Sequence, residues 1–205
     1  MASPEFEEIT KQLKELLKAE QIRSSKASYG VPIRSSMRLH IDYRVINKVT
    51  IKNKYHIPLI ANFFDRLGKA KYFTKMDLWK GYYQVRIAEG EKPKTTCMKR
   101  YGSYEWLVMP FGLTNTPATF CTLMKKIFHT YLDQCVVAYF DDIAIYNNTL
   151  EEQVDHFKRV FHVLRENQLY VKRDKCEFAQ HNVHFLGHII SQGELRMDET
   201  KIRAI

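Results

Sequence analysis

The chain has 205 residues, of which 45% are hydrophobic and 13% aromatic, and its formal net charge is +9 at pH 7. This apolar content excludes a disordered tail, and the length allows one ordinary domain, or two lobes that share a sheet, but not a large multidomain enzyme. A folded protein with this surplus of positive charge is expected to bind a polyanion, either nucleic acid or an acidic membrane surface.

The sequence favours an intracellular location, in the cytoplasm or the nucleus, without membrane contact. No apolar run approaches the roughly 18–20 residues that a membrane-spanning helix needs, and the N-terminus begins with acidic residues instead of an export signal. The four cysteines lie far apart and form no C-x-x-C pair. This spacing is typical of reduced intracellular thiols.

In the first half of the chain, the hydrophobic pattern predicts one helix and several short strands. Apolar residues at three- and four-residue spacings predict an amphipathic helix over residues 5–19. Alternating residues predict a strand over 38–44, and two more short strands are expected over 72–77 and 83–87, on either side of Gly81. The stretch 89–104 is polar and rich in turn residues.

The second half combines helices with a hairpin. Pro117 fits the first turn of a helix. Residues 136–146 (VVAYFDDIAIY) are two β-prone runs that meet at two aspartates, which predicts a β-hairpin. Thr149 and Glu152 form a capping box for a further helix. More strands are expected near 169–172 and 184–191. Strands and helices mixed without βαβ alternation predict an α+β fold.

Three aspartates are candidates for a metal site. Asp141 and Asp142 lie at the predicted hairpin tip, where adjacent carboxylates repel each other unless a cation or solvent shares their charge. Aspartate also favours turns, so the pair alone is weak evidence. Asp77 strengthens it, because it ends the apolar strand 72–77 and would converge with the pair if the two strands are neighbours.

We expect the Asp77 and Asp141 carboxylates to lie close enough to share a divalent ion, with Asp142 beside them and no basic side chain neutralising the group. Carboxylate oxygens suit Mg²⁺. Two such ions can activate a 3′-hydroxyl and stabilise a leaving pyrophosphate. In a basic chain, this site indicates nucleotidyl transfer.

Several segments together resemble one known family. VVAYFDDIAIY resembles the Tyr-x-Asp-Asp hairpin of reverse transcriptases, and the resemblance extends through IDYRVINKVTIKNKYHIPL, AKYFTKMDLWKGYYQVRI, KTTCMKRYGSYEWLVMPFGLTNTPATF and FLGHIIS. Together they resemble the reverse transcriptase domain of a gypsy-type (Metaviridae) long-terminal-repeat retrotransposon Pol polyprotein of a plant lineage. The resemblance implies a right-hand polymerase fold, with fingers at 1–52 and 85–115, palm at 53–84 and 116–192, and the start of a truncated thumb at 193–205.

The resemblance also implies RNA-directed DNA synthesis by a two-metal mechanism, on RNA and DNA template–primers and with deoxynucleoside triphosphates. The residues that match the catalytic, metal-binding positions are Asp77, Asp141 and Asp142, with the Leu78 carbonyl as a further ligand of Mg²⁺ or Mn²⁺. The residues that match the nucleotide-binding positions are Arg38, Tyr82 (the gate against a ribose 2′-hydroxyl), Phe111 and Gly112. The residues that match the primer grip are Leu186, Gly187 and His188. Core packing is the alternative for Tyr82, and a solvated strand charge is the alternative for Arg38.

Two departures from the family pattern favour a second reading. The stretch between Ile33 and Arg38 lacks a longer strand and a Lys-rich turn, and the thumb is missing, which indicates a fragment or a decayed copy. The alternative function is therefore a catalytically impaired remnant that only binds nucleic acid. An RNA-templated RNA polymerase is disfavoured by Tyr82. Zinc is also disfavoured, because no common zinc finger has the spacing of Cys176, His181, His184 and His188.

Overall fold

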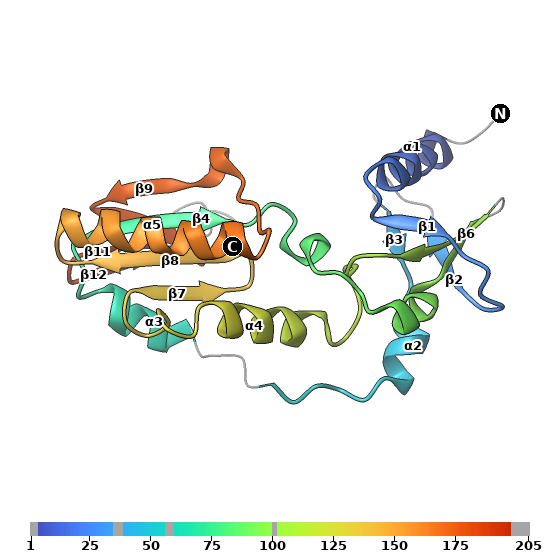
Figure 1. Cartoon of the computed structure of the whole chain (residues 1–205), viewed down its shortest axis with the longest axis horizontal. Coiled ribbons are helices and arrows are strands. Elements are labelled where there is room, and N and C mark those ends of the chain that lie inside the picture. The colour runs from blue at the N-terminus through green and yellow to red at the C-terminus, as the bar shows by residue number, and fades with distance from the viewer. Residues whose placement is uncertain (1–3, 35–38, 56–59, 100–101, 198–205) are drawn as a thin grey trace. The chain divides into compact units, whose positions relative to one another are not determined.

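The computed structural model describes residues 4–34, 39–55, 60–99 and 102–197. The chain divides into two units, each made of two segments of the sequence. Unit 1 contains residues 1–53 and 82–116, and unit 2 contains residues 54–81 and 117–205 (Figure 1). These bounds lie near the predicted fingers and palm bounds, but the naming of the units stays a prediction.

Unit 1 is a five-stranded sheet with a long N-terminal helix. In sheet order the strands are β1 (Ile22–Ser24), β6 (Gly102–Trp106), β5 (Cys97–Lys99), β2 (Val31–Arg34) and β3 (His40–Ile41). All neighbouring strands are antiparallel except β2 and β5. The helical elements are α1 (Pro4–Lys18), α2 (Arg44–Val49) and the 3₁₀ turns η1 (Gly81–Gln84), which begins at the unit boundary, and η2 (Glu89–Thr95).

The core of unit 1 forms because α1 has an apolar stripe. Ile9 and Leu13, four residues apart, lie on one face of the helix and are buried against Ile22, Trp106 and Val108. Lys and Glu residues between them stay outside this stripe. The amphipathic helix predicted over residues 5–19 is therefore confirmed.

Unit 2 has a four-stranded antiparallel sheet at its centre. In sheet order the strands are β7 (Val136–Tyr139), β8 (Asp142–Asn147), β4 (Tyr72–Asp77) and β9 (Glu177–Gln180). A separate three-stranded antiparallel sheet contains β10 (Asn182–Phe185), β11 (His188–Ser191) and β12 (Glu194–Met197). The helices are α3 (Ile60–Leu67), α4 (Thr116–Ile127), α5 (Leu150–Glu166) and the 3₁₀ turn η3 (Arg173–Lys175).

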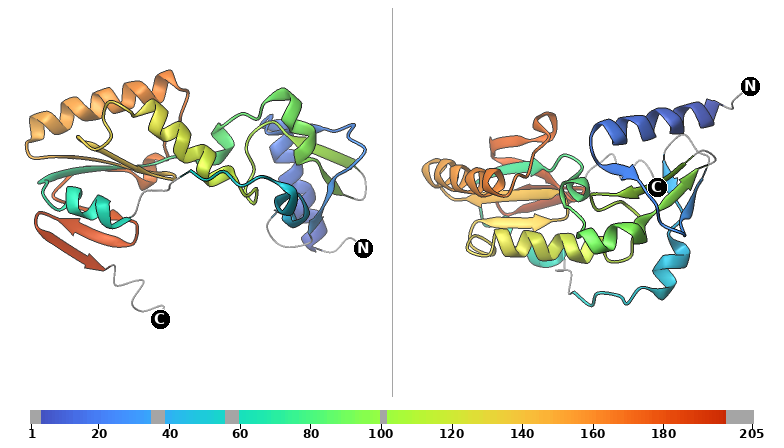
Figure 2. Two further views of the ribbon diagram at one scale, coloured as in Figure 1. Left: turned by 90° about the horizontal axis from the view of Figure 1, so that it is seen from below. Right: turned by 45° about the vertical axis from the view of Figure 1, so that its right-hand side comes forward.

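The helices and the small sheet cover opposite faces of the four-stranded sheet. Figure 2 (left) shows α4 and α5 on one face, and α3 with β10, β11 and β12 on the other. On the second face, Phe73 and Ala144 of the central strands are buried against Phe63 of α3 and Phe185 of β10. This cluster attaches the small sheet to the strand that ends at Asp77.

A buried polar network attaches α5 to the first face. The Gln153 side chain donates to Thr74 Oγ1 at 2.7 Å and accepts from Asn147 Nδ2 at 2.6 Å. Thr149 caps the helix, because its Oγ1 accepts from the Glu152 N–H at 3.3 Å. The predicted capped helix is therefore confirmed.

A strand, a hairpin and the start of a helix in unit 2 match the sequence predictions. The strand at 72–77 and the hairpin at 136–146 are confirmed, and Pro117 lies in the first turn of α4. The region near 184–191 contains two strands, β10 and β11, joined by a turn. None of the described helices is long and apolar enough to cross a lipid bilayer.

Three strand predictions are wrong in whole or in part. Residues 83–87 form the end of η1 and a single bridge from Arg86 to Val108, because the chain turns at Gly81 instead of extending. Near 169–172 there is only a single bridge, from Val171 to Leu78. In the described part of 38–44, a two-residue strand gives way to α2 at Arg44. The stretch 89–104, described only as turn-rich from sequence, contains β5 and the start of β6.

Candidate active site

The register of the central strands brings two of the three aspartates together. Asp77, the last residue of β4, is the direct cross-strand partner of Asp142, the first residue of β8. Directly opposed residues of an antiparallel pair project from the same face with their Cβ atoms about 4.5–5.5 Å apart. The expectation that the Asp77 strand neighbours the hairpin is therefore confirmed.

Asp141 lies in the tight turn that precedes Asp142. Tyr139 pairs with Asp142, so Phe140 and Asp141 form a two-residue loop between β7 and β8. Phe140 has a φ of +51°, as turns of this length require, although the left-handed region costs a residue with a side chain roughly 1–2 kcal/mol. The Leu78 N–H donates to the Asp141 carbonyl at 2.8 Å, which ties the turn to the end of β4.

The Asp141 carboxylate is half-buried, and one of its oxygens has no hydrogen-bond partner among the described residues. This oxygen, Oδ1, is itself buried. A Cβ atom added at Gly81 would overlap with this oxygen and would lie 3.0 Å from Phe120 Cζ. Burial, and then the charges of Asp77 and Asp142, raise the pKa of Asp141 to about 6, while Lys175 acts in the opposite direction. A bound cation would offset both the cost of burying the Asp141 charge and its repulsion by Asp77 and Asp142.

Two lysines already contact the other carboxylates. Lys175 Nζ lies 3.2 Å from Asp77 Oδ2, and Lys75 Nζ lies 3.3 Å from Asp142 Oδ1. The expectation that no basic side chain neutralises the group is therefore wrong. Lys75 is two residues before Asp77 on the same strand, so both side chains project from one face. That spacing is visible in the sequence and could have revealed the contact, whereas Lys175 is brought in from a distant segment.

The donor chemistry fits a hard divalent ion, although the side chains are not gathered around one point. Among the described residues, no three His, Cys, Asp or Glu side chains are grouped as ligands of one metal ion. Carboxylate and carbonyl oxygens are nevertheless the ligands that Mg²⁺ prefers. The buried, unpartnered Oδ1 of Asp141 is the oxygen that a bound ion would stabilise most.

The four residues considered for zinc have separate contacts instead. Cys176 Sγ donates to the Lys172 carbonyl, and His184 lies 3.6 Å from Glu177. The His181 ring lies 4.8 Å from that of Tyr72, and the His188 ring lies 4.7 Å from that of Phe64, in each case between ring centroids.

The nucleotide-binding candidates belong to unit 1. The Tyr82 and Phe111 rings are neighbours, with centroids 5.0 Å apart, and Phe111 is about half exposed. Gly112 has a φ of +95°, and its carbonyl accepts from Asn47 Nδ2 at 2.8 Å. The Asn47 Oδ1 atom also accepts from the Thr114 N–H at 2.9 Å. Arg38 lies outside the described residues.

Asn47 therefore clamps the segment that follows Phe111. In the sequence, Asn47 lies within the segment IDYRVINKVTIKNKYHIPL, and no local signal there identifies this contact.

The primer-grip candidates form the turn between β10 and β11. Phe185 pairs with His188, so Leu186 and Gly187 are a two-residue loop, with φ of +51° and +78°. Leu186 packs against the cluster of buried residues that includes Phe73. Phe73 precedes Asp77 by four residues on β4, so both project from the same face. This turn is therefore attached to the sheet face from which Asp77 and Asp142 project.

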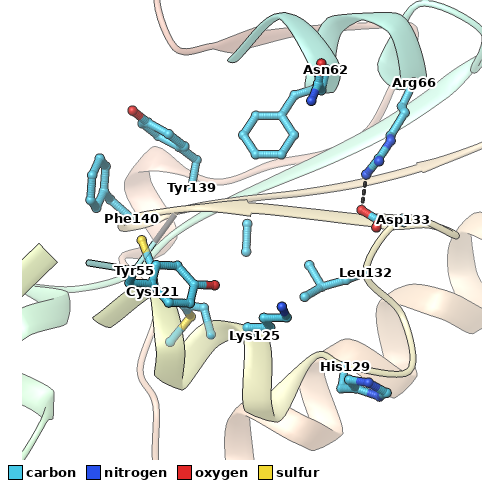
Figure 3. Close-up of a pocket in the computed structure, with 13 residues that line it drawn as sticks. Tyr55, Asn62, Arg66, Cys121, Lys125, His129, Leu132, Asp133, Tyr139 and Phe140 are labelled. Atoms are coloured by element: carbon cyan, nitrogen blue, oxygen red, sulfur yellow. Dashed lines mark hydrogen bonds and ion pairs between the residues drawn. The ribbon is translucent and has the colours of Figure 1, made fainter. Parts of the chain in front are cut away.

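A cavity of about 600 Å³ opens in unit 2 at the β7 edge of the sheet, between α3 and α4. Its lining includes Tyr139 and Phe140, the two residues before Asp141. Figure 3 shows these rings at one end, Lys125 and His129 at the other, and the Arg66–Asp133 ion pair across the edge. Burial raises the pKa of the Cys121 thiol in the wall, so this cysteine is a poor nucleophile.

Comparison with known proteins finds similarity to one family. Residues 23–190 match the family model of reverse transcriptase (RNA-dependent DNA polymerase). An RNA-directed DNA polymerase homolog of Oenothera berteroana is 54% identical over 142 residues, which cover 68% of this chain and 97% of that protein. The retrovirus-related Pol polyprotein from transposon 297 of Drosophila melanogaster is 36% identical over 97% of this chain. The chain spans only 20% of that polyprotein.

Solved structures are similar in fold. The foamy viral protease–reverse transcriptase in complex with double-stranded DNA superposes with a TM-score of 0.87 at 23% identity, over 99% of this chain and 37% of that one. The same enzyme in complex with an RNA/DNA hybrid superposes with a TM-score of 0.83 over 96% of this chain and 28% of that one. The predicted α+β polymerase fold is therefore confirmed.

Proposed function

The chain belongs to the reverse transcriptase (RNA-dependent DNA polymerase) family, and on this basis we propose that it adds deoxynucleotides to a primer 3′-end on RNA and DNA templates. The observation that carries the proposal is the group of three aspartates at the end of β4 and the tip of the β7–β8 hairpin. We assign unit 2 to the palm and unit 1 to the fingers.

Asp77, Asp141, Asp142 and the Leu78 carbonyl would hold Mg²⁺ or Mn²⁺. Such ions, when bound, activate the attacking hydroxyl and stabilise the leaving oxygen of an in-line displacement. The chain itself positions the carboxylates. The Leu78 N–H fixes the Asp141 main chain, and Gly81 leaves room for the Asp141 side chain because it has no Cβ.

Other residues are assigned to binding and orientation. Tyr82 presents a partly exposed ring supported by Phe111, and we assign it to the exclusion of a ribose 2′-hydroxyl. Arg38, Phe111 and Gly112 complete the nucleotide-binding assignment, with Arg38 as a cation for the triphosphate. The turn at Leu186 and Gly187, with His188, is assigned to the primer terminus.

The partners follow from charge and from the fold. The formal net charge of +9 favours a polyanion through counterion release. The structurally similar foamy viral enzyme is bound to double-stranded DNA and to an RNA/DNA hybrid. We therefore propose template–primer duplexes as the macromolecular partner and deoxynucleoside triphosphates as the small substrate.

The test is primer extension by the unaltered chain and by Asp141→Asn. The amide has the shape of the carboxylate but no charge, so we expect extension to fall by at least about 10²-fold, while duplex binding stays within twofold. Asp155→Asn is the matched control, because Asp155 is exposed on α5 and pairs with Arg159. Undiminished extension by Asp141→Asn contradicts the proposal, and duplex binding without extension by the unaltered chain supports the impaired remnant instead.

A further inference from the structure

Two ammonium groups lie where the proposed site needs positive charge. Lys175 contacts Asp77 at 3.2 Å and Lys75 contacts Asp142 at 3.3 Å, so two of the three carboxylates already have a cationic partner. The third, Asp141, has a buried oxygen without a hydrogen-bond partner in the described part of the chain. The carboxylate cluster is therefore partly neutralised by the protein itself.

The contact of Lys75 with Asp142 follows from the register of the sheet. Lys75 is opposite Ala144 and Asp77 is opposite Asp142, so Lys75 and Asp142 are diagonal neighbours on one face. Diagonal neighbours are within reach of a long side chain. The residue directly opposite Lys75, Ala144, has only a methyl side chain. Only 17% of the Lys75 side chain is exposed, so its charge is poorly screened.

The contact of Lys175 with Asp77 is held by the main chain of a different segment. The Lys172 N–H donates to the Asp77 carbonyl at 2.8 Å, and Val171 forms a bridge with Leu78. The Lys175 N–H in turn donates to the Lys172 carbonyl at 3.0 Å, which closes the η3 turn. The segment that carries Lys175 is thus attached to the end of β4. The Lys175 side chain itself is 57% exposed, so it can leave Asp77 without disturbing the core.

We propose that Lys175 and Lys75 act as counter-ions of Asp77 and Asp142 when no divalent ion is bound, and that a divalent ion must displace these ammonium groups to enter the site. This inference rests on the proposed function, because it assumes that the carboxylates are metal ligands. It also accounts for a feature of the structure: the acidic side chains are not grouped around one point, since two of them are directed at lysines. The two lysines touch neither substrate nor metal ion in this account. They act through Asp77 and Asp142, and they raise the concentration of divalent ion needed to fill the site.

The proposal predicts that loss of a lysine charge tightens metal binding. Lys175→Met and Lys75→Met keep most of the unbranched side chain and remove the competing charge. We expect each variant to bind Mn²⁺ about two- to fivefold more tightly than the unaltered chain, and the double variant about tenfold or more. Binding is measured by titration calorimetry on the whole chain without nucleic acid, with Mn²⁺ as the probe.

Two further variants separate the specific contact from net charge. Lys172→Met removes the same charge from an exposed position three residues away, where the link to Asp77 is through the main chain, and its Mn²⁺ affinity should match that of the unaltered chain. Lys175→Arg keeps the positive charge, so its Mn²⁺ affinity should stay as weak as that of the unaltered chain.

A second readout distinguishes a counter-ion from a merely structural ion pair. In EDTA, Lys175→Met should unfold at a lower temperature than the unaltered chain, because three carboxylates then repel each other with less compensation. Saturating Mn²⁺ should remove that difference, since the ion replaces the lost charge. A structural contact would leave the same deficit with and without the ion.

Three outcomes overturn the counter-ion account: equal Mn²⁺ affinity in the unaltered chain, Lys175→Met and Lys75→Met; weaker binding by both variants; or a melting deficit that Mn²⁺ does not remove. If any of these occurs while primer extension is intact, the counter-ion account fails and the proposed function stands. If none of the proteins binds Mn²⁺ and none extends a primer, both fail together.

Discussion

At the scale of single residues, the site combines one strained and one poorly satisfied position. Phe140 occupies the left-handed region, and Asp141, the next residue, keeps an unpartnered buried oxygen. Both features cost folding free energy. Strain of this kind persists only where surrounding structure holds it, and here the strand pairing on both sides of the turn does so.

The raised pKa of Asp141 predicts a pH-dependent stability. Burial, then Asp77 and Asp142, raise this pKa from its ordinary value of 3.8 to about 6. The folded chain then holds the proton more tightly than the unfolded chain, so this group lowers the free energy of unfolding as the pH rises from about 4 to 6. Because the group is partly exposed, we expect a loss of about 1–2 kcal/mol.

This loss is measured as the difference between Asp141→Asn and the unaltered chain, by urea unfolding in EDTA. Carboxyl groups away from the site titrate alike in both proteins and cancel, so the difference reports Asp141 together with its neighbours Asp77 and Asp142. The variant should gain about 1–2 kcal/mol on the unaltered chain between pH 4 and pH 7. A difference that does not change with pH would show that the Asp141 carboxyl titrates normally.

The Tyr82 side chain is expected to select the sugar. Removal of the ring in Tyr82→Ala should admit ribonucleotides and lower the deoxy-to-ribo ratio of kcat/KM by at least about tenfold, as changes in a shaped pocket commonly do. Tyr82→Phe keeps the ring and its packing against Phe111, so it should retain the ratio. An unchanged ratio in Tyr82→Ala would mean that Tyr82 only packs.

At the scale of elements, sequence patterns predicted some β elements correctly and failed at others of similar composition. The strand 72–77 and the hairpin 136–146 carry β-prone runs with clear ends, and the structure contains both. The strand expected over 83–87 has a similar composition, but the chain turns at Gly81 and the segment has only one bridge. Tertiary context decided that case, because a short apolar run is compatible with several local conformations.

The candidate site was also predictable only in part from the sequence. Strand patterns place Asp77 and the aspartate pair at strand ends, but only the pairing of β4 with β8 shows that the two strands are neighbours. The contact of Lys75 is readable from its spacing to Asp77. Lys175 is 98 residues from Asp77, and Gly81 matters only because of where the Asp141 side chain lies. Contacts of this kind depend on the tertiary fold, which no local period encodes.

The close approach of Gly81 to Asp141 yields a prediction about the turn after β4. A Cβ atom at position 81 would displace the Asp141 carboxylate, and misplacement of a catalytic group by about 1 Å can cost about 10²-fold in rate. We therefore expect Gly81→Ala to lower primer extension by about that factor. Gly90→Ala is the control, because a Cβ there would meet nothing within 4 Å. Equal extension by the two variants would contradict the assigned position of Asp141.

At the scale of the whole molecule, the charge surplus and the family agree on a nucleic-acid partner. The chain carries 32 basic and 23 acidic residues. Binding to a duplex should therefore be independent of sequence, and the affinity should fall by at least about tenfold between 50 and 200 mM salt, as expected when a few phosphates are neutralised. Fluorescence anisotropy with two unrelated duplexes measures this. Salt-independent binding would exclude phosphate contacts as its main source.

The most direct test of the central claim is single-nucleotide addition to a labelled DNA primer annealed to an RNA template. The 205-residue chain is supplied with Mg²⁺ or Mn²⁺ and with each of the four deoxynucleoside triphosphates in turn. Our account predicts extension by one residue only with the nucleotide complementary to the template, and none with Asp141→Asn. No extension with any nucleotide, under conditions in which the chain binds the duplex, would contradict it.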